Sequence, residues 1–247
     1  IKSCDARSFN ILDTFFSAYG YKDIYYFNKR NNTILIGLAC NQPLNTCFCT
    51  ALGGEPHSEE GLDGLLVELE NHYLYKPITE KGNKLLSSMK GFKNATPKDI
   101  KKMENLANSA HNAIKTNIDI TNIDKVLDNE FENNIFEKIS KTCLQCGACS
   151  FNCPTCHCFD VIDENDRNSG KRIRIWDTCQ FPLFTKHGSG HNPRHVDKQR
   201  TRQRIFHKFN YYIKNYDLVG CVGCGRCIKV CPAGQDIRST IKVIIQK

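Results

Sequence analysis

The sequence has no apolar run long enough to cross a membrane. No stretch of about eighteen apolar residues occurs in its 247 residues, so no membrane-spanning helix is predicted. The first ten residues, IKSCDARSFN, lack a basic region followed by an apolar segment, so no secretory signal is expected. Nucleotide-binding loops are missing too, since neither GxxxxGK(S/T) nor a complete GxGxxG occurs. We therefore expect no membrane association, and no binding of NAD or ATP by this chain itself.

Cysteine, in contrast, is abundant. Fifteen cysteines are too many for ordinary packing, and an odd number in a large chain without a secretory signal argues against a disulfide framework. Their clustering in C-x-x-C patterns favours metal binding in a reducing compartment, so we expect a cytoplasmic location. With 40% hydrophobic and 24% charged residues the chain is expected to bury a core, and its length suits two modest domains or one large one.

Residues 1–80 have the pattern of an α/β region. Residues 6–19 carry apolar side chains at helical spacing, with Asp5 placed to cap the first turn. Residues 33–39, TILIGLA, form a short apolar run that predicts a buried, parallel strand. Residues 61–75 predict a second amphipathic helix.

Residues 81–141 are rich in Asn and Lys and are predicted to be a helical connecting segment. The pair Thr96-Pro97 suits a helix N-cap and first turn, which starts a helix that extends to about residue 115. A second helical pattern covers residues 121–141. The cysteines return in residues 142–247, which form the third region.

Two segments of this third region repeat the pattern C-x₂-C-x₂-C-x₃-C-P. One begins at Cys143 and the other at Cys221. The pattern is typical of 4Fe–4S proteins, in which three closely spaced thiolates bind one cluster and the fourth Cys binds the other cluster. The predicted ligands of the first cluster are Cys143, Cys146, Cys149 and Cys231. Those of the second cluster are Cys221, Cys224, Cys227 and Cys153.

Two other metal groups fit this region less well. A structural zinc site would use two C-x-x-C pairs and would leave the third and fourth Cys of each run without a role. The stretch from Cys153 to His157 also spells C-x-x-C-H, the pattern of covalent haem attachment. Cys153 is already needed by the second cluster, however, and haem attachment belongs outside a reducing cytoplasm.

Together with the α/β pattern of residues 1–80, the two motifs predict the fold class α+β. An N-terminal α/β region is followed by a mainly helical, ferredoxin-like dicluster domain with a basic insert between Cys153 and Cys221. From Lys171 to Lys208, ten Lys or Arg residues stand against two Asp, which equals the whole net charge of +8. This stretch is either a solvated helix face or a surface that steers an acidic redox protein. Nucleic acid is not expected as a partner, because no nucleotide motif accompanies the basic residues.

Seven cysteines lie outside the two motifs. Four of them are near the amino terminus, and a third 4Fe–4S cluster is the favoured hypothesis for Cys4, Cys40, Cys47 and Cys49. A zinc site and buried free thiols are the alternatives. The other three are Cys156, Cys158 and Cys179. They either pack beside a cluster and tune its reduction potential, or hold one more metal with His157 or Asp177 as a further ligand. We favour packing for these three, and a surface position or a place beside the cluster ligands for His157.

The order of these motifs resembles a known family. The segments CPTCHCFDVIDE, RIWDTCQFP, RTRQRIFHKFNYY and CVGCGRCIKVCP occur in this order. They resemble the iron–sulfur A subunit of anaerobic sulfite reductase and, equally, the beta subunit of cytoplasmic NiFe sulfhydrogenases. The segments CDARSFNILD and CNQPLNTCFCTALGG match that family too, so the similarity spans almost the whole chain.

The resemblance implies an electron-transfer role. Such subunits pass electrons between an FAD-containing subunit, which is NAD(P)H- or ferredoxin-linked, and a catalytic subunit of an anaerobic oxidoreductase. FAD and NAD(P)H are then expected only on the partner, and no residue of this chain is assigned an acid–base or nucleophilic role. An iron–sulfur sensor is one alternative. A stand-alone reductase, with an open metal site near Cys156, Cys158 and Cys179, is the other.

Overall fold

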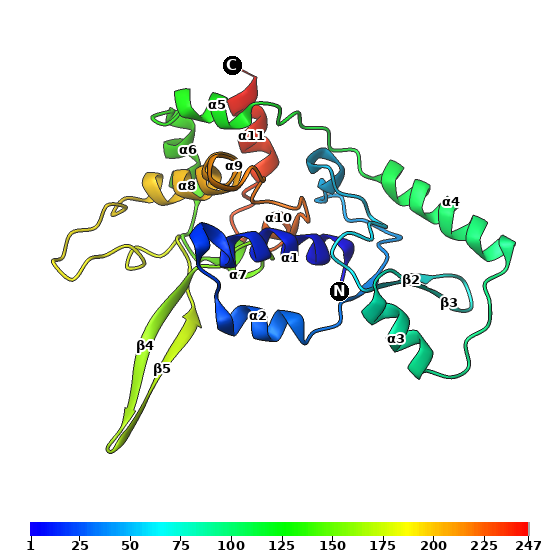
Figure 1. Ribbon diagram of the computed structural model, residues 1–247. Helices are drawn as coiled ribbons and strands as arrows, with labels where there is room; N and C mark the ends of the chain where they lie inside the picture. The colour runs from blue at the N-terminus through cyan, green and yellow to red at the C-terminus, as the bar shows by residue number, and fades with distance from the viewer. Residues whose placement is uncertain (247) are drawn as a thin grey trace. The chain divides into compact units, whose positions relative to one another are not determined.

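The computed structural model describes residues 1–246 and divides the chain into two compact units. Unit 1 comprises Ile1–Asp119 together with the short segment Cys221–Gly225, and unit 2 comprises Ile120–Gly220 and the chain from Arg226 onward. The predicted connecting segment, residues 81–141, is therefore shared between the units. Helices and small sheets are both present, so the fold class is α+β, as predicted (Figure 1).

Unit 1 combines a three-stranded sheet with four α-helices among its described residues. Its helices are α1 (Ser3–Phe16), α2 (Ile24–Asn31), α3 (Glu80–Ser88) and α4 (Pro97–Ala113), with short 3-10 helices η1 (Ala18–Gly20) and η2 (Cys49–Leu52). Its strands are β1 (Ile36–Leu38), β2 (Gly64–Glu68) and β3 (Tyr73–Pro77).

Three predicted elements of unit 1 are confirmed. They are the helix at residues 6–19, the strand at residues 33–39 and the helix that starts at Thr96-Pro97. Helix α1 begins at Ser3, three residues before the expected start, and the Asp5 carboxylate accepts the backbone N–H of Lys2 at 3.0 Å. Strand β1 pairs in parallel with β2. Helix α4 begins at Pro97 with Thr96 as its N-cap, as the sequence indicates. Buried side chains from α1, from the two residues that flank β1 and from β2 form one core, and residues of α4 pack against it.

The helix predicted for residues 61–75 is wrong. This stretch contains β2 and β3, which pair antiparallel with Leu66 opposite Tyr75. Its leucines do recur at helical spacing, but local periodicity is a weak signal against tertiary pairing. A strand such as β1 must pair its N–H and C=O groups, and β2 supplies the partner.

Unit 2 is mainly helical, with one hairpin. Its helices are α5 (Ile123–Asn129), α6 (Asn134–Thr142), α7 (Ala148–Phe151), α8 (Asp197–Phe206), α9 (Tyr212–Tyr216), α10 (Arg226–Lys229) and α11 (Ile237–Ile245). Its strands are β4 (Phe159–Asp166) and β5 (Ser169–Trp176). The helical pattern predicted for residues 121–141 is in fact two helices, because Asn133 caps a new start at α6.

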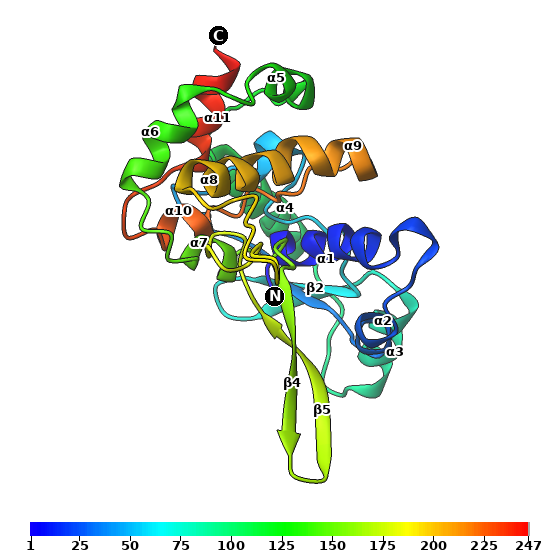
Figure 2. The ribbon, with the colours of Figure 1, turned by 90° about the vertical axis from the view of Figure 1, so that its left-hand side faces the viewer.

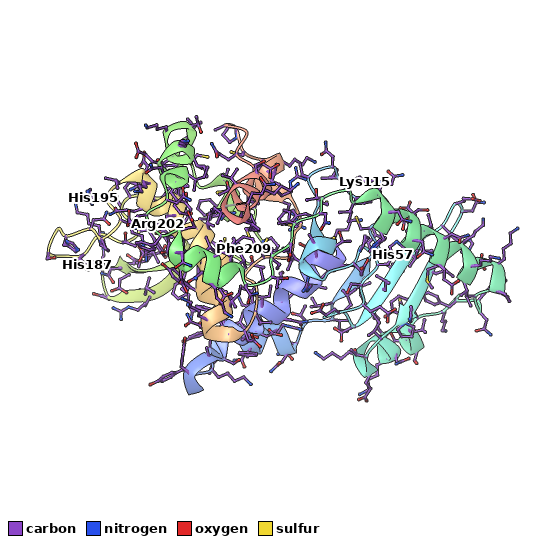
Figure 3. All side chains as sticks on the ribbon, turned by 90° about the horizontal axis from the view of Figure 1, so that it is seen from above. His57, Lys115, His187, His195, Arg202 and Phe209 are labelled. Atoms are coloured by element: carbon purple, nitrogen blue, oxygen red, sulfur yellow. The ribbon has the colours of Figure 1, made fainter. Side chains whose placement is uncertain are left out.

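Helix α8 continues through a π-helical turn, η3 (His207–Tyr211), into α9. Helix α8 packs against α6, and η3 packs against α5. Phe206 and Phe209 are buried on this continuous helix, and Figure 3 shows Phe209 among the helices while His187 and His195 lie on the loop that precedes α8. The π-turn is a local feature that often marks functional positions.

The hairpin of β4 and β5 extends away from the helices of unit 2, as Figures 1 and 2 both show. Its residues pair in register from Phe159 opposite Trp176 to Asp166 opposite Ser169. All side chains of the two strands are exposed or half-buried. The sequence predicts a basic insert in this region but does not predict its strands.

Candidate iron–sulfur centres

The four thiols predicted to bind the first cluster line one cavity of unit 2, and Cys227 lines it as well. These four are Cys143, Cys146, Cys149 and Cys231. Cys143 ends α6, Cys149 lies in α7, and Cys231 follows α10, so three helices bring the thiols together. Apolar side chains such as Ile205 and Ile237 complete the lining, and the Cys146 side of the cavity is exposed.

The turn before α7 depends on Gly147. This residue has a φ of 73°, and a Cβ there would lie 2.8 Å from Cγ2 of the buried Thr178. Glycine adopts a positive φ without strain, so the chain can reverse tightly between Cys146 and Cys149. This reversal directs two thiols of the motif toward one cavity.

The electrostatics of the cavity suit thiolates bound to a cationic group. Burial raises the pKa of the Cys143 thiol, and the neighbouring thiolates of Cys149, Cys231 and Cys146 raise it further. Such mutual repulsion is offset when iron binds the sulfurs. In addition, the backbone N–H of Gln235 donates to Cys231 Sγ at 3.3 Å, a bond that stabilises a thiolate. The donor set therefore fits a 4Fe–4S cluster.

The thiols predicted for the second cluster fall in both units. Cys153 and Cys227 belong to unit 2. Burial is the main cause that raises the pKa of Cys227, and the nearby Cys153 thiolate raises it further. Cys221 and Cys224 belong to unit 1, and the backbone N–H of Gly223 lies 3.5 Å from Cys221 Sγ as a donor. The full set of four stays a prediction of the motif.

Three of the four amino-terminal thiols are neighbours in unit 1. Burial raises the pKa of Cys49 to about 11, and the thiolates of Cys47 and Cys40 contribute to the shift. Burial also raises the pKa of Cys40, with a smaller effect of Cys47. Cys4 lies within the first turn of α1 rather than before it, which corrects the sequence-based placement. The carbonyl of Pro56 joins these segments, since it accepts both the Ser3 hydroxyl and the Cys40 N–H.

Buried polar atoms around these thiols have no partner within residues 1–246. They are Asn41 Oδ1, Thr46 Oγ1 and His57 Nε2. Thr46 directly precedes Cys47 and His57 follows Pro56, so both are adjacent to the thiol-bearing segments. Unpaired buried polar atoms are rare in proteins and call for an explanation. A bound group whose sulfurs accept hydrogen bonds from Thr46 and His57 would provide one.

Two glycines of the second motif pack against the amino-terminal thiol loop, and all of these residues lie in unit 1. The N–H of Phe48 donates to the Gly223 carbonyl at 2.8 Å. A Cβ on Gly223 would lie 2.6 Å from the Cys49 backbone, and one on Gly225 would lie 2.3 Å from the Thr46 carbonyl oxygen. Both glycines have positive φ values. Only glycine permits this approach of the two loops.

The three remaining cysteines lie at the base of the hairpin in unit 2. The Cys158 thiol donates a hydrogen bond to Cys179, which raises the pKa of Cys158 and lowers that of Cys179 to about 6. Cys156 in the same way donates to Cys153. No group of three or more His, Cys, Asp or Glu side chains in the described residues is arranged to hold a single metal ion.

His157 is buried, not on the surface as one reading of the sequence expected. Burial lowers its pKa to about 4, and Nδ1 lies 3.2 Å from the hydroxyl of Tyr212. It is therefore a neutral side chain packed beside the cysteines at physiological pH.

Part of the basic stretch is buried as well, which contradicts the solvated helix face. Arg200, Arg204 and Lys208 are 4%, 9% and 5% exposed. Lys208 Nζ lies 3.2 Å from Cys153 Sγ, and Arg204 Nη1 lies 3.7 Å from Cys156 Sγ. Sequence reasoning missed these contacts, although the i, i+4 spacing of the three cations was a usable signal, since it places them on one helix face.

Comparison with known proteins identifies the family. A family model described as a 4Fe-4S dicluster domain matches residues 142–235. Sulfhydrogenase 2 subunit beta of Pyrococcus furiosus is 32% identical over 239 residues, which covers 94% of this chain and 69% of that protein. The chain belongs to the iron–sulfur beta-subunit family of the sulfhydrogenases. Family membership and the matched domain support iron–sulfur clusters as cofactors and electron transfer as the function.

Two further findings concern the structure. No solved structure matches the chain. Among the described residues, no helix has the length and apolarity needed to span a membrane.

Proposed function

We propose that this chain is the electron-transfer subunit of an oxidoreductase complex, with two 4Fe–4S clusters in the dicluster domain and a third at the amino-terminal thiols. Each cluster, when bound, accepts and releases one electron. The observation that carries the proposal is the cavity of unit 2, which brings Cys143, Cys146, Cys149 and Cys231 together from three helices.

Observations in unit 1 support the proposed third cluster. Cys40, Cys47 and Cys49 influence one another electrostatically, and Thr46 and His57 have unpaired polar atoms beside them. Cys4 is the proposed fourth ligand. The close packing of Gly223 and Gly225 on this loop would bring the third cluster near the second motif, as a relay requires.

We further propose a hydrogenase-type catalytic partner and an FAD-containing, NAD(P)H- or ferredoxin-linked partner. The similar Pyrococcus furiosus protein is named as a sulfhydrogenase subunit, which favours the hydrogenase branch over the sulfite reductase branch. In this proposal cysteine thiolates hold the clusters, and we assign no residue a catalytic role. The exposed Cys146 marks a point where a partner could approach the first cluster.

The test is purification of the tagged chain from its native cells under anaerobic conditions. We expect a flavoprotein and a catalytic subunit to co-purify, with NAD(P)H-linked hydrogen turnover. In a Cys146→Ser complex this turnover should be lost, while hydrogen turnover with a viologen dye that reacts directly with the catalytic subunit should persist. If the isolated chain reduces substrate with dithionite as the electron donor, the proposal is rejected. If the complex turns over sulfite instead of hydrogen, the catalytic partner is of the sulfite reductase type.

A further inference from the structure

A buried ammonium group contacts one of the proposed cluster ligands. Lys208 lies on the π-helical turn η3 and is 5% exposed. Its Nζ lies 3.2 Å from Cys153 Sγ, 2.9 Å from Thr155 Oγ1 and 3.0 Å from the Gly220 carbonyl oxygen. An ammonium group has three donors, and here three acceptors surround it.

The surroundings hold this ammonium group in place. The Thr155 hydroxyl donates to the same Gly220 carbonyl at 2.8 Å, so Thr155 and Gly220 form a fixed cradle on one side of Lys208. Burial of a charged group is costly unless it is paired and hydrogen-bonded. Of the three acceptors, the Thr155 hydroxyl and the Gly220 carbonyl are neutral, and the Cys153 sulfur can carry a negative charge as a thiolate ligand.

We propose that Lys208 raises the reduction potential of the cluster that Cys153 binds. The inference rests on the proposed ligation by Cys153. Reduction adds one negative charge, and a cation hydrogen-bonded to a ligand sulfur stabilises the reduced state more than the oxidised state. Hydrogen bonds to the sulfurs and burial are the factors by which proteins set such potentials.

The test is an EPR-monitored redox titration of the cluster-loaded protein. Lys208→Met removes the charge and the donors, and Lys208→Gln removes the charge but keeps a donor. We expect about a tenfold smaller equilibrium constant for reduction of one cluster in Lys208→Met, or about 59 mV for one electron. Lys214→Met is the matched control, because Lys214 is on the following helix, is half-exposed and pairs with Asp128 instead of a thiol.

The possible results distinguish a failure of the Lys208 proposal from a failure of the proposed ligation by Cys153. Unchanged potentials in both Lys208 variants with full iron would overturn the inference, and so would an equal shift in Lys214→Met. Failure of both Lys208 variants to load iron would also overturn it, because Lys208 would then serve assembly and not tuning. If Cys153→Ser leaves every EPR signal intact, the proposed ligation fails instead, independently of Lys208.

Discussion

Phe48 donates its backbone N–H to the carbonyl oxygen of Gly223 at 2.8 Å, and so joins two cysteine-bearing segments that are far apart in the sequence. One is the loop with Cys47 and Cys49, and the other is the short segment that unit 1 contains from the second motif. This contact gives the amino-terminal thiols a structural connection to the dicluster motif.

Gly223→Ala is expected to destabilise unit 1. The substitution forces a non-glycine residue to a φ of 65° and places its Cβ 2.6 Å from the Cys49 backbone. The positive φ alone costs about 1–2 kcal/mol, and displacement of the loop adds to this. We expect the midpoint of thermal unfolding to fall by about 5 °C or more. Gly188→Ala is the control, since a Cβ there would contact nothing within 4 Å; equal midpoints for the two variants would contradict this account.

Cys153→Ser should damage the second cluster selectively. We expect loss of the EPR signal of the cluster assigned to Cys221, Cys224 and Cys227, while the first cluster keeps its signal, because its four thiols are untouched. Cys156→Ser is the comparison, since Cys156 neighbours Cys153 but lies outside both motifs. Equal loss of both signals in Cys153→Ser would argue against the exchanged ligands.

Cys47→Ser tests the amino-terminal site. Analysis of iron and acid-labile sulfide should give about twelve irons in the native chain and about eight in the variant, because three 4Fe–4S clusters become two. About eight irons in both, with one zinc ion in the native chain, would support the zinc alternative. About eight irons and no zinc would leave Cys47 as a half-buried free thiol.

His207 should make unit 2 sensitive to acid. Burial lowers its pKa from 6.5 to about 3, and the charge of Lys208 lowers it further. The unfolded chain therefore binds a proton below pH 6.5 that the folded chain does not, and stability falls with decreasing pH by at most about 1.4 kcal/mol per pH unit. Between about pH 7.5 and about pH 5.5, the midpoint temperature of His207→Gln should fall less than that of the native chain. Parallel curves would show that other groups cause the loss.

The spacing of the cysteines predicts which thiols line the cavity of unit 2. Short local spacing groups Cys143, Cys146 and Cys149, and the exchange of the fourth Cys between the motifs adds Cys231. All four line the cavity in unit 2, and their binding of one cluster stays a prediction. Helices α1 and α4 were predictable for a similar reason, since apolar periodicity and the Thr96 cap act within a few residues.

Other features depend on contacts between distant residues. Residues 61–75 have a helical pattern, yet β1 requires β2 as its partner. The spacing of Lys208 places it on one helix face with Arg200 and Arg204, but only packing shows that its ammonium group faces Cys153 and Gly220. The unpaired atoms of Thr46 and His57 could not be inferred at all, because hydrogen-bond satisfaction is a property of the folded chain.

The hairpin of β4 and β5 has a consequence for local opening. A two-stranded ribbon is marginally stable in water on its own, so its tip around Asp166 and Ser169 should exchange amide hydrogens quickly. Its base is different, because Thr178 is fully buried and Cys179 is nearly so. Protection should therefore rise steeply from tip to base. The ribbon can fray and close again while the thiols at its base stay covered.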